Sequence, residues 1–214
     1  MAGLEHKDIF KPNLKTVIDI GANKGQFALA SRKYAPNAKI FSFEPLENPS
    51  KIFSKIFLND KNTYLYSVAI GPKPRNLFIN LSAREDSSSI LKIGHNQTKL
   101  FKGTDFIGKK KIRVAPLNFF LNKRKILRPS LLKIDVQGFE FEVLKGSLSL
   151  LKYFDFIYCE CSYIELYEKQ KLAPEIIVLM KSNGFSLVKI YNAICDKNNK
   201  TIQADLFFMN SVPN

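Results

Sequence analysis

A glycine-bearing turn near the start of the chain carries the residues best suited to hold a ligand. The apolar run 16–21 ends in Asp19 and Gly21 at alternate positions. Asn23 and Gly25 continue this spacing just beyond the run. A larger side chain than Gly21 would block a ligand, while Gly25 lets the next helix pack closely and expose its N-terminal amides. Asn23 tolerates the backbone angles of such a turn, and the Asp19 carboxylate could accept hydrogen bonds from an ammonium group. Alone, this loose glycine pattern is a weak sign of function.

An acid at the end of the next expected strand narrows the choice of ligand. Glu44 precedes Pro45 and follows the glycines by roughly 20 residues, where a carboxylate can accept both hydroxyls of a ribose. The turn lacks the third glycine of the dinucleotide fingerprint, and its acids would repel a pyrophosphate. The sequence therefore predicts a nucleoside ligand with a positive charge and no phosphate. S-adenosylmethionine has the required ribose, sulfonium and amino-acid end.

A third acid follows a later apolar run. Asp135 comes at the end of the expected strand 131–136, and ligands of open α/β sheets bind at the carboxyl ends of strands. Gly138 makes the turn into a helix whose first turn holds Glu140 and Glu142. For both glutamates, stabilisation of the helix dipole is favoured over catalysis. Asp135 is expected to face the ligand.

Strand and helix patterns alternate along the chain and would bring these residues together. Strands are expected at 16–21, 39–44, 63–71, 131–136, 156–161, 185–191 and 202–209, a further one being possible at 76–81, and helices at 25–34, 45–58, 139–153 and 174–182. In the helix 45–58, Ile52, Phe53, Ile56 and Phe57 are expected on one face. Residues 196–200 can form a hairpin loop between the last two strands. The predicted fold is a three-layer α/β/α Rossmann-like methyltransferase fold, with a mostly parallel seven-stranded sheet and a closing antiparallel hairpin.

The middle of the chain follows no sustained period. Residues 82–108 are polar, and a loop of that length is usually a functional lid or a mobile segment. We expect one domain over residues 1–214, with a variable loop at about 82–111, and we expect acceptor recognition to lie within 82–121. His95 lies in this segment and could reach the site only if the loop folds over it. His6 lies in the N-terminal stretch and has little support as a catalytic group.

The formal net charge of +14, from 33 Lys and Arg against 19 Asp and Glu, suggests an anionic partner. The basic residues are scattered, however, and the densest run, 109–111, is expected in a loop. Aromatic side chains are not interleaved with basic ones, so specific nucleic-acid binding is not expected. Attraction of anionic substrates, or weak association with an acidic membrane surface, is at least as plausible. No apolar run reaches the roughly 20 residues needed to span a bilayer, and residues 1–13 do not resemble a signal peptide.

Cysteine usage favours a reducing, cytoplasmic location. The three cysteines, Cys159, Cys161 and Cys195, lack the spacing of a disulfide framework or a zinc ribbon. Cys159 and Cys161 are expected to be small apolar packing residues of one strand. No metal site is predicted.

Three segments in this order make the chain resemble FkbM-type methyltransferases of class I. They are the stretch 17–25 (VIDIGANKG), the stretch 43–45 (FEP) and the stretch 132–140 (LKIDVQGFE). Residues 158–160 and 203–207 also match the family pattern, so the resemblance runs from about residue 16 to 209. The strand and glycine turn at 132–140 form its more specific part.

The resemblance implies S-adenosylmethionine-dependent O-methylation of a hydroxyl on a sugar, glycan or related natural product. The cofactor-binding residues that it implies are Asp19, Gly21, Ala22, Asn23, Gly25, Phe27, Glu44, Pro45, Val68, Ala69 and Asp135. Val68 and Ala69 would lie beside the adenine, and Asp135 near the methionine end and the acceptor. Where the family usually has an acid, this chain has Gln137, which puts a metal or a charged base there in doubt. The serines at 87–89 resemble a family segment that helps to close the site.

Methyl transfer to a hydroxyl needs a positioned acceptor and is assisted by a general base. Asp135 is the first candidate for that base and Glu160 the second. Two alternatives remain: a non-catalytic module that binds the cofactor, and a nucleic-acid methyltransferase suggested by the charge. The stretch 135–138 (DVQG) stands where N-methylating DNA enzymes carry Asp/Asn-Pro-Pro-Tyr, which argues against the second alternative.

Overall fold

The computed structural model describes residues 7–10 and 13–211. Within these residues, a seven-stranded sheet has the order β3-β2-β1-β7-β8-β10-β9, and a three-stranded sheet has the order β4-β6-β5. The strands of the large sheet are β1 (Thr16–Ile20), β2 (Lys39–Phe43), β3 (Thr63–Tyr66), β7 (Ser130–Ile134), β8 (Phe156–Ser162), β9 (Phe185–Cys195) and β10 (Thr201–Asn210). Those of the small sheet are β4 (Ala69–Ile70), β5 (Arg75–Ser82) and β6 (Phe106–Ala115).

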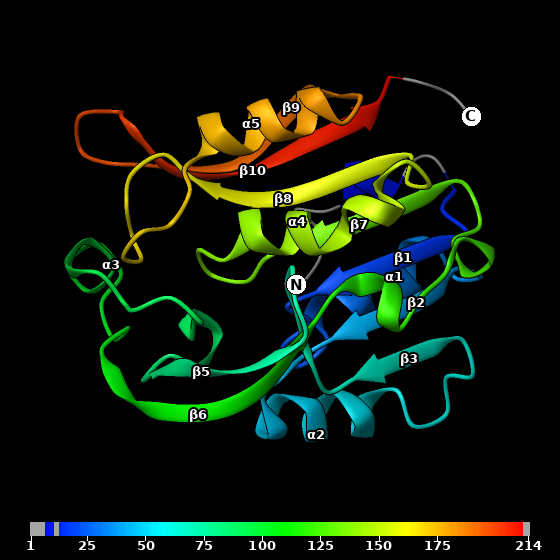
Figure 1. Ribbon diagram of the computed structural model, residues 1–214, viewed down its shortest axis with the longest axis horizontal. Coiled ribbons are helices and arrows are strands. Elements are labelled where there is room, and N and C mark those ends of the chain that lie inside the picture. The colour runs from blue at the N-terminus through cyan, green and yellow to red at the C-terminus, as the bar shows by residue number, and fades with distance from the viewer. Residues whose placement is uncertain (1–6, 11–12, 212–214) are drawn as a thin grey trace.

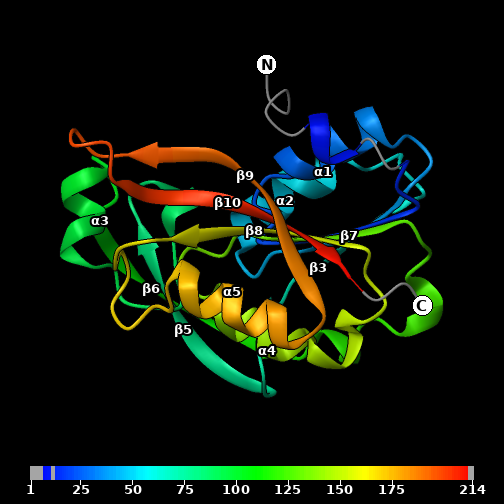
Figure 2. The ribbon, with the colours of Figure 1, turned by 90° about the horizontal axis from the view of Figure 1, so that it is seen from above.

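Helices cover both faces of the large sheet (Figure 2). Seen from above, α1 and α2 lie on one side of the strands, and α4 and α5 lie on the other. The α-helices are α1 (Gln26–Tyr34), α2 (Glu47–Ile56), α3 (His95–Leu100), α4 (Glu140–Leu151) and α5 (Ala173–Ser182). The short 3-10 helices are η1 (Lys7–Phe10), η2 (Glu85–Ser87), η3 (Leu117–Phe119) and η4 (Lys123–Lys125). The predicted α/β/α layering is therefore confirmed.

The central strands are apolar on both faces because helices cover both. Every residue of β1 and of β7 is buried, as expected for parallel strands between two helical layers. Successive side chains of a strand point to opposite faces, so Val17 packs in the cluster beneath α1 and Ile18 in the cluster beneath α4. Cys159 and Cys161 are free thiols buried in the α4 cluster, which confirms their expected packing role.

The closing hairpin forms as predicted. β10 pairs antiparallel with both β8 and β9, while β3, β2, β1, β7 and β8 are parallel. In Figure 1 the arrowheads of β1, β3 and β8 point towards the side where α3, β5 and β6 lie. The carboxyl ends of the parallel strands thus face the small sheet, and a ligand site is expected at that edge.

Three expectations for the first half of the chain are wrong. The single strand 63–71 is two strands in different sheets, because the chain leaves the large sheet after Tyr66 and pairs with β6 from Ala69. The segment 82–111 contains η2, α3 and the start of β6, so the lysines at 109–111 lie in a strand. In α2, Ile52 and Ile56 are 40% and 45% exposed, because this helix packs through Phe53 and Phe57.

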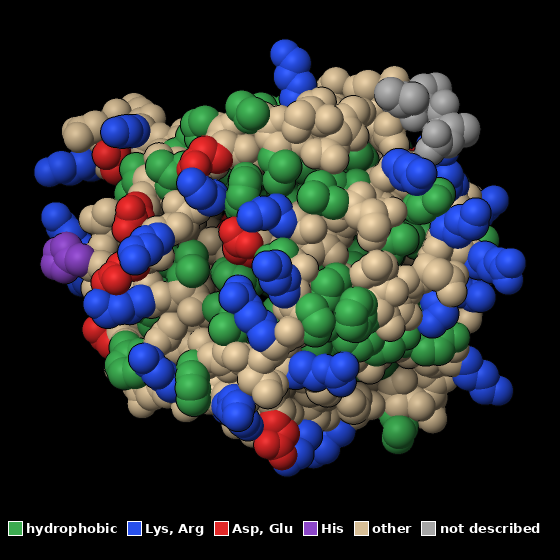
Figure 3. Space-filling view, viewed as in Figure 1, with side chains coloured by type: hydrophobic (Ala, Val, Ile, Leu, Met, Phe, Trp, Pro, Cys, Tyr) green, Lys and Arg blue, Asp and Glu red, His purple; other side chains and the backbone are tan. Residues whose placement is uncertain are grey.

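The basic residues are spread over the surface, as the sequence suggests. Figure 3 has Lys and Arg side chains across the whole visible face, over several elements. Among residues 7–10 and 13–211, no helix combines the length and the apolar character needed to cross a membrane.

Candidate functional site

The turn after β1 lies against the end of β7, and Gly21 makes this approach possible. Gly21 has a φ of +79°, and a Cβ at this position would overlap the backbone carbonyl oxygen of Asp135. Its N–H and that of Ala22 donate to the carbonyl oxygen of Phe43, at 3.0 and 3.1 Å. The Asp135 N–H donates to the Ile20 carbonyl oxygen at 3.1 Å. The ends of β1, β2 and β7 are thereby tied together around a residue without a side chain.

Gly25 serves the packing of α1. Its φ is +95°, and a Cβ here would come within 2.8 to 2.9 Å of the rings of Phe57 and Phe53. The predicted close approach of this helix is therefore confirmed, and it is made to α2. Asn23 adopts the left-handed conformation expected of it, with a φ of +48°.

Glu44 is held at the end of β2 by two backbone donors. The Asn23 N–H donates to its Oε2 at 2.9 Å, and the Leu46 N–H donates to its Oε1 at 2.8 Å. The residue is 6% exposed, and this burial raises the pKa of Glu44 to about 7, against the lowering effect of the two backbone hydrogen bonds. Each carboxylate oxygen keeps a second lone pair for a ligand.

Lys133 separates Asp19 from the space above the strands. Its Nζ lies 3.1 Å from Asp19 Oδ1, 3.0 Å from the carbonyl oxygen of Gly21 and 3.8 Å from Asp135 Oδ2. Burial of this ammonium opposes its charge, but the Asp19 and Asp135 carboxylates outweigh that effect and raise the pKa of Lys133. Asp19 is fully buried and its partner is Lys133, so the predicted direct contact between Asp19 and a ligand is not supported.

A cavity of about 310 Å³ opens at this edge of the sheet. Apolar side chains of several elements line it, including Phe27, Phe43, Ile70 and Phe139. Its acidic lining residues are Glu44, Glu85, Asp86, Asp135, Glu160 and Asp205, and its basic lining residue is Lys133. A cavity of this size and acidity suits a small ligand that carries positive charge.

Asp135 and Glu160 meet in the cavity wall through Gln137. The Gln137 Nε2 donates to Asp135 Oδ1 at 2.8 Å and to Glu160 Oε2 at 2.9 Å. Burial, together with the nearby carboxyl groups of Asp135 and Glu140, raises the pKa of Glu160 well above its usual range. The structure therefore brings together the two acids that the sequence singled out as candidate bases.

Glu140, in the first turn of α4, binds the turn that precedes the helix. Its Oε1 accepts the N–H of Val136 at 3.1 Å and that of Gly138 at 3.0 Å. Burial raises the pKa of Glu140 to about 7. Its carboxyl group thus fixes the turn that carries Asp135 and Gln137.

A second polar group in the cavity wall was not singled out from the sequence. The Tyr158 hydroxyl donates to Asp205 Oδ2 at 2.6 Å, and Asn192 Nδ2 donates to the same oxygen at 2.7 Å. Tyr158 and Asp205 both line the cavity. Because β8 and β10 pair antiparallel, only the register of the closing hairpin brings these side chains together.

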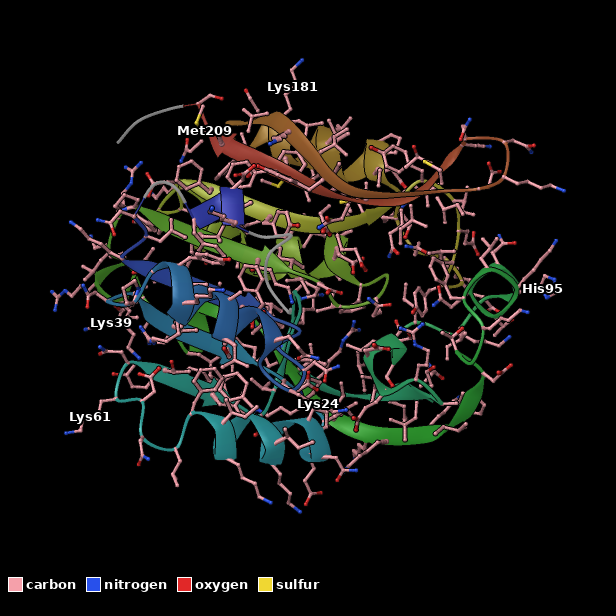
Figure 4. All side chains as sticks on the ribbon, turned by 180° about the vertical axis from the view of Figure 1, so that it is seen from behind. Lys24, Lys39, Lys61, His95, Lys181 and Met209 are labelled. Carbon is pink, nitrogen blue, oxygen red and sulfur yellow. The ribbon has the colours of Figure 1, made fainter. Side chains whose placement is uncertain are left out.

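The segment after β5 covers the cavity. Glu85, Asp86, Ser88 and Ile90 line it, and Lys24 Nζ of the β1 turn lies 3.0 Å from Glu85 Oε2. His95 does not take part: it is exposed at the start of α3, and Figure 4 places it on the outer side of the molecule, far from Lys24. His6 lies outside the described residues.

Most residues assigned to the cofactor or to catalysis share one cavity. Those that line it are Gly21, Ala22, Asn23, Phe27, Glu44, Pro45, Ala69, Asp135 and Glu160. Asp19, Gly25 and Val68 do not line it, although each is within three residues of one that does. Within the described residues, no group of three or more His, Cys, Asp or Glu side chains is arranged to hold a metal ion.

Comparisons with known proteins agree with this geometry. The chain is 28% identical over 178 residues to 2-O-methyltransferase NoeI of Sinorhizobium fredii, covering 80% of this chain and 72% of that protein. It shares a TM-score of 0.59 and 12% identity with the crystal structure of methyltransferase FkbM from Methylobacillus flagellatus, over 92% of this chain and 44% of that one. The chain thus spans less than half the length of that FkbM protein.

A more distant fold relative is Sp1610 of Streptococcus pneumoniae, a putative tRNA (m1A22) methyltransferase solved in complex with S-adenosyl-L-methionine. It has a TM-score of 0.56 and 8% identity over 97% of this chain and 71% of that one. The methyltransferase FkbM domain model matches residues 19–187, which include the glycine turn, Glu44 and the Asp135–Glu160 pair. The chain therefore belongs to the FkbM family of methyltransferases.

Proposed function

We propose that this methyltransferase uses S-adenosylmethionine to methylate a hydroxyl group on a sugar or glycan. The observation that carries the proposal is the Glu44 carboxylate, held in the cavity by two backbone N–H groups and opposite Asp135 across the Gly21 turn. Ribose recognition by a carboxylate at the end of the second strand is the usual arrangement in such α/β sheets.

The residues present fit the proposed cofactor. Gly21 lines the cavity and lets the β1 turn close against Asp135, a role other than the expected clearance for a ligand, and the acidic lining favours a sulfonium and an ammonium group. The side-chain oxygen of Asn23 is buried in the cavity wall and has no hydrogen-bond partner among the described residues, so a ligand donor would satisfy it. Bound S-adenosylmethionine would supply an electrophilic methyl group on its sulfonium sulfur.

In methyl transfer, the protein would position the acceptor hydroxyl and receive its proton. As the acceptor oxygen bonds to the methyl carbon and the carbon–sulfur bond breaks, the Asp135 carboxylate would take up the hydroxyl proton. General-base help of this kind contributes about 10²–10⁴-fold. Phe27, Phe139 and Ile90 in the lining would exclude water from the reacting atoms.

A sugar acceptor is favoured over a polyanion by the charge of the cavity. Six acidic side chains and one lysine line it, and this acidity disfavours the phosphates of a nucleic acid. The relative NoeI is named for 2-O-methylation. In this chain, Tyr158, Asp205 and Gln137 are polar groups of the wall that could orient hydroxyls.

Transfer of labelled methyl groups tests this proposal. The protein is incubated with S-adenosyl-[methyl-³H]methionine and a panel of methyl pyranosides, each also in forms lacking one hydroxyl. We expect label in at least one glycoside and its loss when the acceptor hydroxyl is missing. Cofactor binding with no transfer to any member would favour a non-catalytic module. Transfer to an RNA pool alone would overturn the sugar assignment.

Cofactor affinity is expected to depend on pH through Glu44. A carboxyl group with a pKa of about 7 is ionised above that value, and the ionised form accepts both ribose hydroxyls. Because binding at lower pH must displace a proton, affinity is expected to fall by about tenfold per pH unit below 7. Calorimetric titration with S-adenosylmethionine between pH 5.5 and 7.5 measures this slope.

The Glu44→Gln variant is expected to bind more weakly at pH 7.5 and to lose the slope. Glu142→Gln is the matched control, since Glu142 does not line the cavity. A slope that persists in Glu44→Gln would assign it to another group and remove the ribose role.

A further inference from the structure

A glutamine stands between the two candidate bases in an unusual backbone conformation. Gln137 lies in the turn between β7 and α4 and has a φ of +57°. A residue with a long side chain adopts this left-handed conformation at a cost of about 1–2 kcal/mol. Such a backbone persists only where surrounding contacts hold it, and it often marks a functional position.

Every polar atom of the Gln137 side chain has a partner. Its Oε1 lies 2.9 Å from the Tyr167 hydroxyl, which in turn lies 3.1 Å from the carbonyl oxygen of Ser87. The single Tyr167 hydroxyl hydrogen is shared between these two acceptors, so the orientation of the amide is set by Asp135 and Glu160, whose oxygens accept from the Nε2. The Nε2 then gives one hydrogen to Asp135 Oδ1 and the other to Glu160 Oε2.

This amide joins two acids without adding a charge. Besides Asp135, the Glu160 carboxyl faces the acids Glu140 and Asp205, which disfavour its ionisation, and Lys133, which favours it. Two carboxyl groups that both accept from one NH₂ group are held at a fixed distance and orientation. A glutamate in this place would bring a third acid into contact with the pair, with no hydrogen atoms to bridge them.

We propose that Gln137 is a positioning residue for methyl transfer, whose amide holds Asp135 Oδ1 against Glu160 so that Asp135 Oδ2, which lies 3.8 Å from Lys133 Nζ, is aimed at the acceptor hydroxyl. This inference rests on the proposed function, since it assigns Asp135 the acceptor's proton. It differs from a packing role because the amide acts on the proton acceptor, so loss of the amide is expected to change the rate and its pH dependence more than the affinity for the cofactor product.

The test compares Gln137→Met, which keeps the length but removes both donors, and Gln137→Glu, which adds the third acid. Gln97→Met is the matched control: Gln97 is also buried, but it lies in α3 and does not line the cavity.

Three quantities are measured for each variant. Calorimetry gives the affinity for S-adenosylhomocysteine, and carboxyl ¹³C NMR gives the titration midpoint of Glu160, whose signal is assigned with Glu160→Gln. The third quantity is kcat as a function of pH, with the acceptor found in the glycoside panel.

In Gln137→Met, kcat is expected to fall about 10- to 100-fold, while the affinity for S-adenosylhomocysteine changes less than threefold. In Gln137→Glu, the Glu160 midpoint and the acidic limb of the kcat profile are both expected to move to higher pH by about one unit. Gln97→Met should move neither.

Two results would overturn the inference alone: wild-type kcat and Glu160 midpoint in both variants, or affinity for S-adenosylhomocysteine that falls in step with kcat. Failure of the wild-type protein to bind S-adenosylhomocysteine would instead overturn the proposed function, and this inference with it.

Discussion

Replacing Gly21 with alanine is expected to abolish cofactor binding and to destabilise the fold. The added methyl group would overlap the carbonyl oxygen of Asp135, and that backbone is fixed by its own hydrogen bond to Ile20. The left-handed φ of +79° adds a conformational cost of about 1–2 kcal/mol, and overpacking adds about 1–3 kcal/mol. We therefore expect the free energy of unfolding to fall by about 2–5 kcal/mol, measured by urea denaturation.

Gly103→Ala separates the two causes. Gly103 has the same φ of +79°, but a Cβ there would have only the Arg84 side chain nearby, at 3.8 Å. This variant should lose about 1–2 kcal/mol and bind S-adenosylmethionine as the wild type does. Equal losses of stability in the two variants, with cofactor binding intact in both, would show that the β1–β7 approach is not needed for the site.

The Asp135→Asn variant is expected to bind the cofactor but to transfer methyl groups about 10²–10⁴ times more slowly. The asparagine Oδ1 can still accept from Gln137, so the wall keeps its shape, but the amide cannot take up the acceptor proton. Single-turnover transfer of labelled methyl to the panel acceptor measures the chemical step, and calorimetry with S-adenosylmethionine measures the retained affinity.

Glu160→Gln identifies which acid receives the proton. Burial and neighbouring acids raise the pKa of Glu160, which favours its neutral form, and we assign the acceptor's proton to Asp135. Its replacement should slow transfer less than Asp135→Asn does. If Glu160→Gln shows the larger loss and Asp135→Asn stays near the wild-type rate, the roles of the two acids are exchanged.

The sequence predicts the layers and the strand-end acids because both depend on local patterns. The runs that become β1 and β7 are short and mostly apolar, as expected for strands covered on both faces, and the loop at 196–200 is too short for a crossover. Glu44 and Asp135 follow from their places at strand ends, which the parallel sheet brings to one edge.

Contacts between strands that are distant in the sequence determine the features that local patterns do not predict. Asp19, the residue before the last of β1, is expected from the sequence to face a ligand, but the register places it beside Lys133 of β7, and both side chains are buried. Tyr158 meets Asp205 only through the register of β8 with β10. Ser67 and Val68 give no local sign that the chain changes sheet between β3 and β4, because that change depends on the pairing of Ala69 with Val114.

Gln137 is the instructive case among the site residues. In the sequence, Gln137 stands where the family usually has an acid, which puts a charge-dependent role at this position in doubt. The structure instead directs both of its amide hydrogens to the carboxyl groups of Asp135 and Glu160, while the Tyr167 hydroxyl from a distant loop lies 2.9 Å from its Oε1.

Calorimetric titration of the wild-type protein with S-adenosylmethionine at pH 7.5 tests the central claim most directly. The Glu44 contacts, the Gly21 turn and the acidic cavity predict one binding site per chain with a dissociation constant of about 1 μM to 1 mM. They also predict much weaker binding to Glu44→Gln. Absence of binding heat up to millimolar ligand, in a protein that unfolds cooperatively, would contradict the account.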